Sequence, residues 1–303
     1  MKLSTHTDVE SLCHSPENGS PVFERFSVII FITLLLSVSL AARPDLRNDF
    51  LNNGFNANVQ ALANTGIISA EGPEGAFYNP ALLFTASKNL LLSVNQYQYD
   101  HSLFYGFYKY PKPLSKAIFA LGYVLDTVGQ VEYRKEATTM PDSVVNLNRQ
   151  AVIVAMSRQV DTDIYMGVSA TLIGDNYSNS TDSNIILALG LLYDGGELGR
   201  LSSTLKYLAE GEYSAGVGVS QKLLESLTAY VTAEYYYSQT YMTLGYKLAL
   251  AYCFDKDLRF NGGWNINALT MGLSYQVNEN LAFQYALINT AIGMDHSFSM
   301  VLF

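Results

Sequence analysis

Residues 213–220 read YSAGVGVS, in which apolar side chains alternate with serine and glycine. The same alternation returns in residues 227–235 (LTAYVTAEY), 242–252 (MTLGYKLALAY) and 269–277 (LTMGLSYQV). A period of two places each set of side chains on one face of a β-strand. One face of these strands is therefore apolar and aromatic, and the other carries hydroxyls, glycines, amides and a few charges.

The length of these runs distinguishes a soluble β-protein from a transmembrane β-barrel. Strands in soluble proteins average about 5–6 residues, whereas these runs are about as long as the ten tilted residues that cross an outer-membrane hydrocarbon layer. We expect residues 90–303 to form a transmembrane antiparallel β-barrel of about fourteen strands, an even number as in bacterial single-chain barrels. Two polar stretches, residues 127–147 and 174–182, are expected to be external loops.

The composition supports an all-β membrane protein. The 303-residue chain has 15% charged and 13% aromatic residues, 22 of them tyrosine, and a mean hydropathy of +0.11. Tyrosine is enriched at membrane–water boundaries, and a barrel keeps mean hydropathy low because half of each strand faces a polar interior. The net charge of −9 argues against a nucleic-acid partner. The expected partner is outer-membrane lipid, and the expected location is the bacterial outer membrane.

The N-terminal region contains a long apolar run without alternation, Val28–Ala42 (VIIFITLLLSVSLAA). This run is shorter than the roughly 20 residues that a spanning helix needs, and it ends in small residues. We therefore expect residues 1–42 to be a signal peptide with a long leader. A retained anchor helix is the alternative interpretation.

Residues 43–89 differ from the strands that follow them. Residues 56–63 (NANVQALA) favour a short helix, and residues 75–83 (GAFYNPALL) contain an Asn-Pro pair that favours a turn. We expect this segment to fold inside or across one mouth of the barrel as a plug. An ordinary periplasmic extension is the alternative.

The GAFYNPALL element resembles the NPA element of FadL-type outer-membrane proteins, which include fatty-acid and hydrocarbon transporters and PorV-type barrels. Residues 189–193 (LGLLY) and 296–303 (HSFSMVLF) resemble further segments of that group. The resemblance implies fourteen strands and a plug that gates passive entry of hydrophobic molecules such as long-chain fatty acids. The ligand would enter at the loops and leave through a break in the wall. Its implied ligand and plug residues are Phe77, Tyr78, Asn79, Pro80 and Ala81.

Two other functions remain open at this stage. A PorV-like barrel would serve protein secretion or surface attachment without transport of its own. A general porin is disfavoured by the small residues of the polar face and by the segment 43–89.

The sequence contains no recognisable catalytic or metal-binding motif, such as G-x-S-x-G, H-E-x-x-H or a phosphate-cradling glycine loop. We therefore expect no enzyme activity, no catalytic residue, no cofactor and no metal. The charges on the polar faces should point into the lumen, because Lys or Arg facing lipid at mid-depth costs about 2–4 kcal/mol. They are expected to pair inside the lumen or hold the plug, although Arg149 or Lys247 is alternatively a partner for the carboxylate of an acyl ligand. The lumen charges are Arg149, Lys206, Glu234 and Lys247.

The chain ends on Phe303, and a terminal aromatic residue on an amphipathic strand resembles the signal read by the barrel-assembly machinery. This machinery is the expected protein partner. Ser297 and Ser299 fall on the Phe303 side of the strand, whereas Phe298 and its apolar neighbours form the other side. The register of the last strand is therefore left open.

Overall fold

The computed structural model describes residues 51, 54–97, 101–110, 116–133, 143–177, 180–208, 212–238, 242–266, 268–290 and 293–303. The signal peptide predicted for residues 1–42 lies outside these described residues. Among them, no helix is long and apolar enough to cross a membrane.

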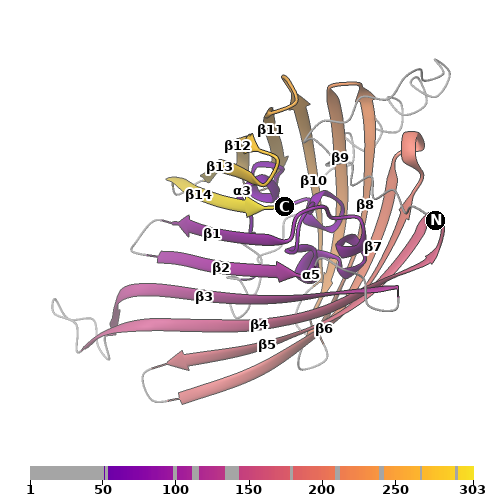
Figure 1. Cartoon of the computed structure of the whole chain (residues 1–303). Coiled ribbons are helices and arrows are strands. Elements are labelled where there is room, and N and C mark those ends of the chain that lie inside the picture. The colour runs from indigo at the N-terminus through magenta and orange to yellow at the C-terminus, as the bar shows by residue number, and fades with distance from the viewer. Residues whose placement is uncertain are drawn as a thin grey trace.

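Fourteen antiparallel strands close into one barrel, in which each strand pairs with its neighbours in sequence and β1 pairs with β14 (Figure 1). The predicted all-β barrel with an N-terminal plug is therefore confirmed. The strands are β1 (Leu90–Gln96), β2 (His101–Lys109), β3 (Ala117–Tyr133), β4 (Ser143–Asp161), β5 (Ile164–Tyr177), β6 (Ser180–Asp194), β7 (Arg200–Leu208), β8 (Glu212–Leu224), β9 (Leu227–Tyr237), β10 (Met242–Cys253), β11 (Leu258–Asn265), β12 (Ala268–Asn278), β13 (Leu281–Thr290) and β14 (Gly293–Leu302).

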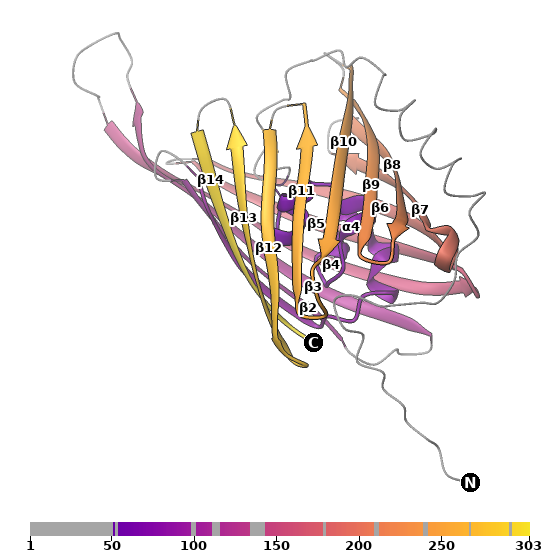
Figure 2. The ribbon, with the colours of Figure 1, turned by 90° about the horizontal axis from the view of Figure 1, so that it is seen from above.

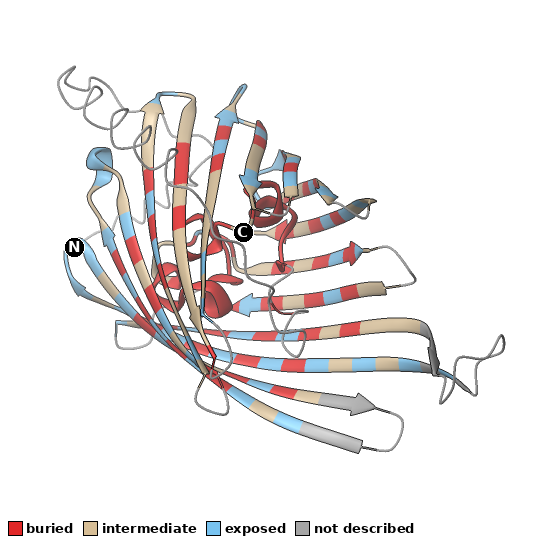
Figure 3. Cartoon of the chain, turned by 180° about the vertical axis from the view of Figure 1, so that it is seen from behind, coloured by how far each residue is buried: buried red, intermediate tan, exposed pale blue. Residues whose placement is uncertain are grey.

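The outer and inner faces of the wall follow the alternation in the sequence. On β12, Leu269 and Met271 are 53% and 51% exposed on the outer face, whereas Thr270 and Ser274 are buried on the inner face. The same alternation of exposed and buried residues runs along most strands (Figure 3). An apolar outer face and a polar inner face are typical of a barrel that sits in lipid.

Two details of the strands differ from the sequence-based expectations. The stretches expected to be loops are partly strand, because β3 continues to Tyr133, β4 begins at Ser143, and β5 and β6 extend to Tyr177 and from Ser180. Polar side chains indicate that a segment lies in water, not that it lacks strand structure. A pair of strands can continue beyond the bilayer because its backbone hydrogen bonds do not depend on lipid. The open register of β14 is also settled: Ser297 and Ser299 are buried inside, and Phe298 is 51% exposed outside.

From residue 54 onward, the plug lies inside the barrel as four short helices (Figures 1 and 2). Its first helix lies against β11–β14, its second against β7–β9, and the last one against β3–β6. The helices are α3 (Ala57–Ala61), α4 (Gly66–Ser69), α5 (Gly75–Tyr78) and the 3₁₀ helix η2 (Pro80–Phe84), and a further 3₁₀ turn, η3 (Gly196–Leu198), joins β6 to β7.

Candidate functional site

Asn79 joins the plug to the barrel wall. It lies in an extended conformation between α5 and η2, and its Oδ1 accepts a hydrogen bond from the Ala81 amide at 3.1 Å. Its Nδ2 donates to the carbonyl of Ile67 at 3.1 Å and to the carbonyl of Leu191 in β6 at 3.2 Å. Pro80 begins η2, where a missing N–H costs nothing. One asparagine thus ties α4, η2 and β6 together.

The wall opposite Asn79 and Pro80 consists of residues with little or no side chain. Gly167 of β5 and Gly190 of β6 face each other in the ladder, and Ser157 of β4 is the next residue in the same row. A Cβ on Gly167 would lie 2.3 Å from the Pro80 carbonyl carbon, and a Cβ on Gly190 would lie 2.1 Å from Asn79 Oδ1. We call Ser157, Gly167 and Gly190 the NPA seat, because only small residues let the plug backbone approach the wall this closely.

Ser157 adds a hydrogen bond to this contact, since its Oγ donates to the Ala81 carbonyl at 3.2 Å. The other plug helices rest on glycines in the same way. A Cβ on Gly218 would lie 2.9 Å from Ile68 of α4, and one on Gly272 would lie 2.5 Å from Ala61 of α3. The glycines on the inner strand faces are therefore the surface on which the plug packs. The sequence showed these glycines as part of a small-residue face, but it did not show which of them contact the plug.

Phe77 and Tyr78 belong to an aromatic cluster between the plug and β2. Phe77 packs edge-on against Phe55 at 4.6 Å, and Phe55 packs against Tyr105 of β2 at 5.4 Å. The Tyr78 hydroxyl accepts a hydrogen bond from the Phe55 amide at 2.7 Å. Burial raises the pKa of Tyr78 well above its ordinary value, so the phenol stays protonated. Phe107 of β2 completes the cluster.

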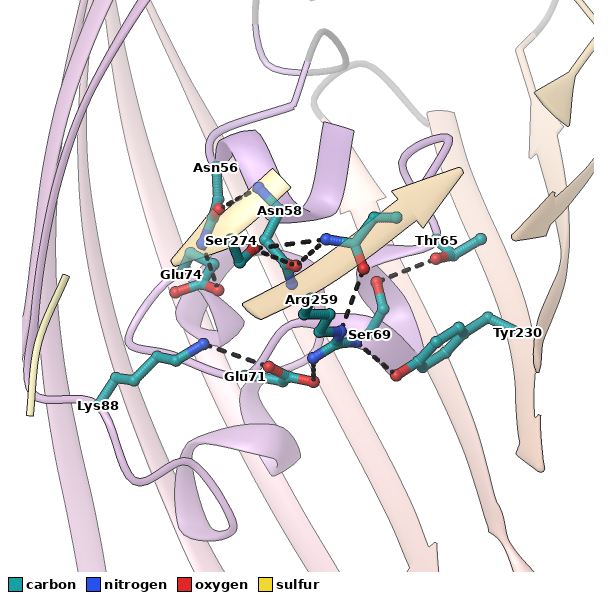
Figure 4. A network of polar contacts seen from close by, with 11 residues as sticks. Asn56, Asn58, Thr65, Ser69, Glu71, Glu74, Lys88, Tyr230, Arg259 and Ser274 are labelled. Carbon is teal, nitrogen blue, oxygen red and sulfur yellow. Dashed lines mark hydrogen bonds and ion pairs between the residues drawn. The ribbon is translucent and has the colours of Figure 1, made fainter. Parts of the chain in front are cut away.

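A buried polar network holds the plug to the opposite wall (Figure 4). Glu71 pairs with Nη1 of Arg259 in β11 at 2.7 Å and with Lys88 at 3.2 Å. Arg259 also donates to the Tyr230 hydroxyl at 2.9 Å and to Asn261 Oδ1 at 3.1 Å. Burial alone would raise the pKa of Glu71, but the charges of Arg259 and Lys88 outweigh it and lower the pKa to about 2.

The network continues through the amides of α3. Asn261 of β11 donates to Asn58 Oδ1 at 2.9 Å, and Ser274 of β12 lies within hydrogen-bonding distance of the same oxygen at 3.4 Å. Asn56 donates to Glu74 Oε1 at 3.0 Å. Burial raises the pKa of Glu74. The contacts of Asn58 with Asn261 and Ser274 join residues 203 and 216 positions apart in the chain, so no sequence spacing could have indicated them.

Three of the four predicted lumen charges make ion pairs. Arg149 pairs with Asp126 of the neighbouring β3 at 2.6 Å, and the same carboxylate contacts His101 at 2.6 Å. Lys247 pairs with Glu234 at 2.8 Å and donates to the carbonyl of Asn64 in the plug at 3.0 Å.

Lys206 differs from Arg149 and Lys247, because its Nζ lies 3.9 Å from the centre of the Phe77 ring, a cation–π contact. Among the described residues it is the lumen cation of the predicted set without a carboxylate within ion-pair distance. Within the same residues, no group of three His, Cys, Asp or Glu side chains is placed to hold a metal. Phe303 packs at the edge of the plug core, and its amide donates to the Asn280 carbonyl.

The closed barrel, its apolar outer face and its internal plug define an outer-membrane β-barrel protein. No family model and no curated protein matches the sequence. Three solved structures illustrate what the fold matches. The CymD monoaromatic hydrocarbon channel has a TM-score of 0.57 and 11% identity over 82% of this chain and 96% of that one. The Pseudomonas putida toluene transporter TodX has a TM-score of 0.58 and 10% identity over 82% and 96%.

A Pseudomonas aeruginosa FadL homologue has a TM-score of 0.54 and 11% identity over 81% of this chain and 97% of that chain. The chain therefore has the fold of the FadL-type channels, as the resemblance of its NPA element implied.

Proposed function

We propose that this barrel lets small hydrophobic molecules pass across the outer membrane passively, and that its plug is the gate. The observation that carries the proposal is the division of the inner wall into an apolar and a polar part. Inward side chains of β3–β6 are largely apolar and pack with the plug core: Val124, Ile153, Ile173 and Ile186. Inward side chains of β8–β14 are mostly polar, with small apolar residues such as Ala249 and Ala286 between them. The polar ones include Ser220, Thr232, Arg259, Thr270, Ser274 and Gln284.

The two parts of the wall favour different solutes. An apolar molecule gains about 0.8 kcal/mol for each CH₂ group that leaves water for an apolar environment. An apolar molecule that crosses the barrel therefore gains the most transfer free energy along β3–β6. This path passes the NPA seat, so Asn79 and Pro80 must move away from Gly167 and Gly190 before the path opens. The fold shared with proteins named as a hydrocarbon channel and a toluene transporter also supports the passage of hydrophobic molecules.

The ion pairs bear on whether the ligand is charged. Long-chain fatty acids, the expected class, need a partner for their carboxylate. Arg149 and Lys247 are occupied by Asp126 and Glu234, which argues against the role considered for them from the sequence. Lys206 beside Phe77 is the better candidate on geometry. A Lys206→Met variant separates the two ligand types, because it should reduce uptake of a fatty acid and leave uptake of toluene unchanged.

Uptake by a Gram-negative host that lacks its own hydrophobic-compound channel tests the proposal. Radiolabelled toluene and oleate should accumulate faster with the protein than without it. Ile186→Asn places an amide on the apolar wall and should slow uptake, whereas the matched Ser220→Asn on the polar wall should not. Unchanged uptake with folded protein would overturn the proposal and favour the secretion alternative. Rapid swelling of proteoliposomes in sugar would show an open porin and overturn it as well.

A further inference from the structure

The apolar belt on the outside of the barrel differs in height from strand to strand. On β10 the outward apolar side chains run from Met242 to Tyr252. With a rise of about 3.3 Å per residue and a tilt near 40°, this stretch covers about 25 Å along the membrane normal. On β1 the outward apolar side chains run from Leu90 to Val94, which covers about 10 Å by the same geometry. The belt at β1 is thus less than half as tall.

A polar row interrupts the belt at this place, and among the described residues of β14, β1 and β2 only Met294 of β14 is an exposed apolar side chain beyond it. Gln96 follows Val94 on the outer face of β1, and the register places it beside His296 of β14 and Ser102 of β2. Gln96 and His296 are exposed, and a ring nitrogen of His296 lies 2.7 Å from the Tyr285 hydroxyl. We call β14, β1 and β2 the seam, because β1 and β14 close the barrel.

The other end of the belt at the seam is also fixed. Leu302 pairs with Leu90 in the last row, and Asn89, the residue before β1, hydrogen bonds back to the Leu302 carbonyl at 2.9 Å. On the side beyond this row the chain passes into the plug at Lys88, which is buried. The belt therefore has no further outward apolar row on β1, and beside β2 it continues by one residue, Tyr110.

The short belt is local to the seam, because the belt is taller on other strands such as β6 and β12, which we call the tall wall. Outward apolar side chains run from Ile185 to Tyr193 on β6 and from Leu269 to Val277 on β12. Each of these stretches covers about 20 Å along the normal. A bilayer that matches β6, β10 and β12 is therefore thicker than the belt at the seam, whatever depth the barrel takes.

We propose that the seam thins the outer membrane beside it. Hydrocarbon offers no hydrogen bonds to Gln96, Ser102 or His296, and a wall shorter than the bilayer is matched by local thinning of the lipid. The polar row then contacts lipid headgroups at a depth where β6 and β10 still contact acyl chains. β1 begins at the end of the barrel where short turns join β8 to β9 and β12 to β13. Short turns face the periplasm in bacterial barrels, so Gln96 lies toward the outside and the thinned leaflet is the outer one. This proposal does not depend on the proposed transport.

Depth-dependent fluorescence quenching tests the position of the polar row directly. The chain has a single tryptophan, so Trp264→Phe removes the background and Gln96→Trp or Leu248→Trp adds one reporter on β1 or β10. The protein is folded into vesicles of phosphatidylcholine with bromine atoms at known chain depths. The reporter at residue 96 should be quenched by shallow bromines and the reporter at residue 248 by deep ones. Equal quenching of both by deep bromines would overturn the proposal.

Lengthening the belt is the second test. Gln96→Leu with His296→Leu adds an apolar row at the seam, and Gln150→Leu with Ser183→Leu adds apolar groups on the exposed outer face of the tall wall. Both pairs remove one hydrogen bond to a tyrosine hydroxyl. Urea unfolding midpoints are measured in vesicles of phosphatidylcholine with chains of increasing length. The acyl-chain length that gives the highest unfolding midpoint should increase for the seam pair and stay unchanged for the control pair. Equal increases for both pairs would refute local thinning at the seam.

Discussion

The contact between the plug and the NPA seat can be tested with one methyl group. In Gly167→Ala, the new Cβ would lie 2.3 Å from the Pro80 carbonyl carbon and 2.5 Å from the Ala81 nitrogen, both backbone atoms. Ordinary contacts begin near 3.4 Å. Neither the strand nor the plug backbone can rotate away as a side chain would, so the plug must retreat by about 1 Å.

The cost of this retreat follows from the contacts it breaks. Moving η2 by this amount lengthens the hydrogen bond from Ser157 to Ala81, at 3.2 Å, and the bond from Asn79 to Leu191, at 3.2 Å. Two lost hydrogen bonds cost about 1 kcal/mol each, and overpacking costs about 1–3 kcal/mol. The docked plug should therefore lose about 3–5 kcal/mol, which raises the undocked fraction by about 150- to 4,500-fold.

Planar-bilayer conductance and limited proteolysis of the plug report this fraction. Gly167→Ala should show more frequent opening and faster cleavage within residues 75–89. The matched control is Gly245→Ala on β10, which lies in the same lateral row of the wall but where a Cβ would meet nothing within 4 Å. Wild-type behaviour in Gly167→Ala, or equal changes in both variants, would refute the claim that the plug rests on wall glycines.

Three further predictions concern the polar contacts of the plug. Arg259→Met leaves the Glu71 carboxylate without its strongest partner and should lower the free energy of unfolding by about 3–5 kcal/mol in urea titrations, whereas the double variant with Glu71→Gln should recover part of that loss. Because the pKa of Glu71 is lowered to about 2, its pairing is complete above its ordinary pKa near 4.5 and is lost as the pH falls through 2, so conductance should rise over that window. Glu71→Gln should remove that pH dependence, and a window unchanged by the substitution would contradict the assignment. Asn79→Asp keeps the acceptor for Ala81 but loses both donated hydrogen bonds, so it should loosen the plug by about 1–3 kcal/mol in the proteolysis assay; protection equal to wild type would show that these donors do not hold the plug.

The sequence by itself determined the class of fold and the two faces of most strands, with the last strand, β14, left open. Alternation at a period of two is a local property, because neighbouring side chains on a strand always point to opposite faces. Leu269 and Thr270 could therefore be assigned to lipid and lumen without knowledge of any partner strand. The same reasoning misplaced the ends of β3 to β6, because hydropathy marks the edge of the membrane and strand pairing continues beyond it.

Only the tertiary structure decided which residues of the lumen meet. Asp126 lies directly opposite Arg149 on the next strand, so a complete register was needed to pair them. Glu71 and Arg259 are 188 positions apart and meet because closure of the barrel brings β11 around to the plug. The register around a closed barrel depends on all fourteen ladders together. No local pattern contains it, and the partners of the plug therefore follow from the closed fold rather than from any stretch of the chain.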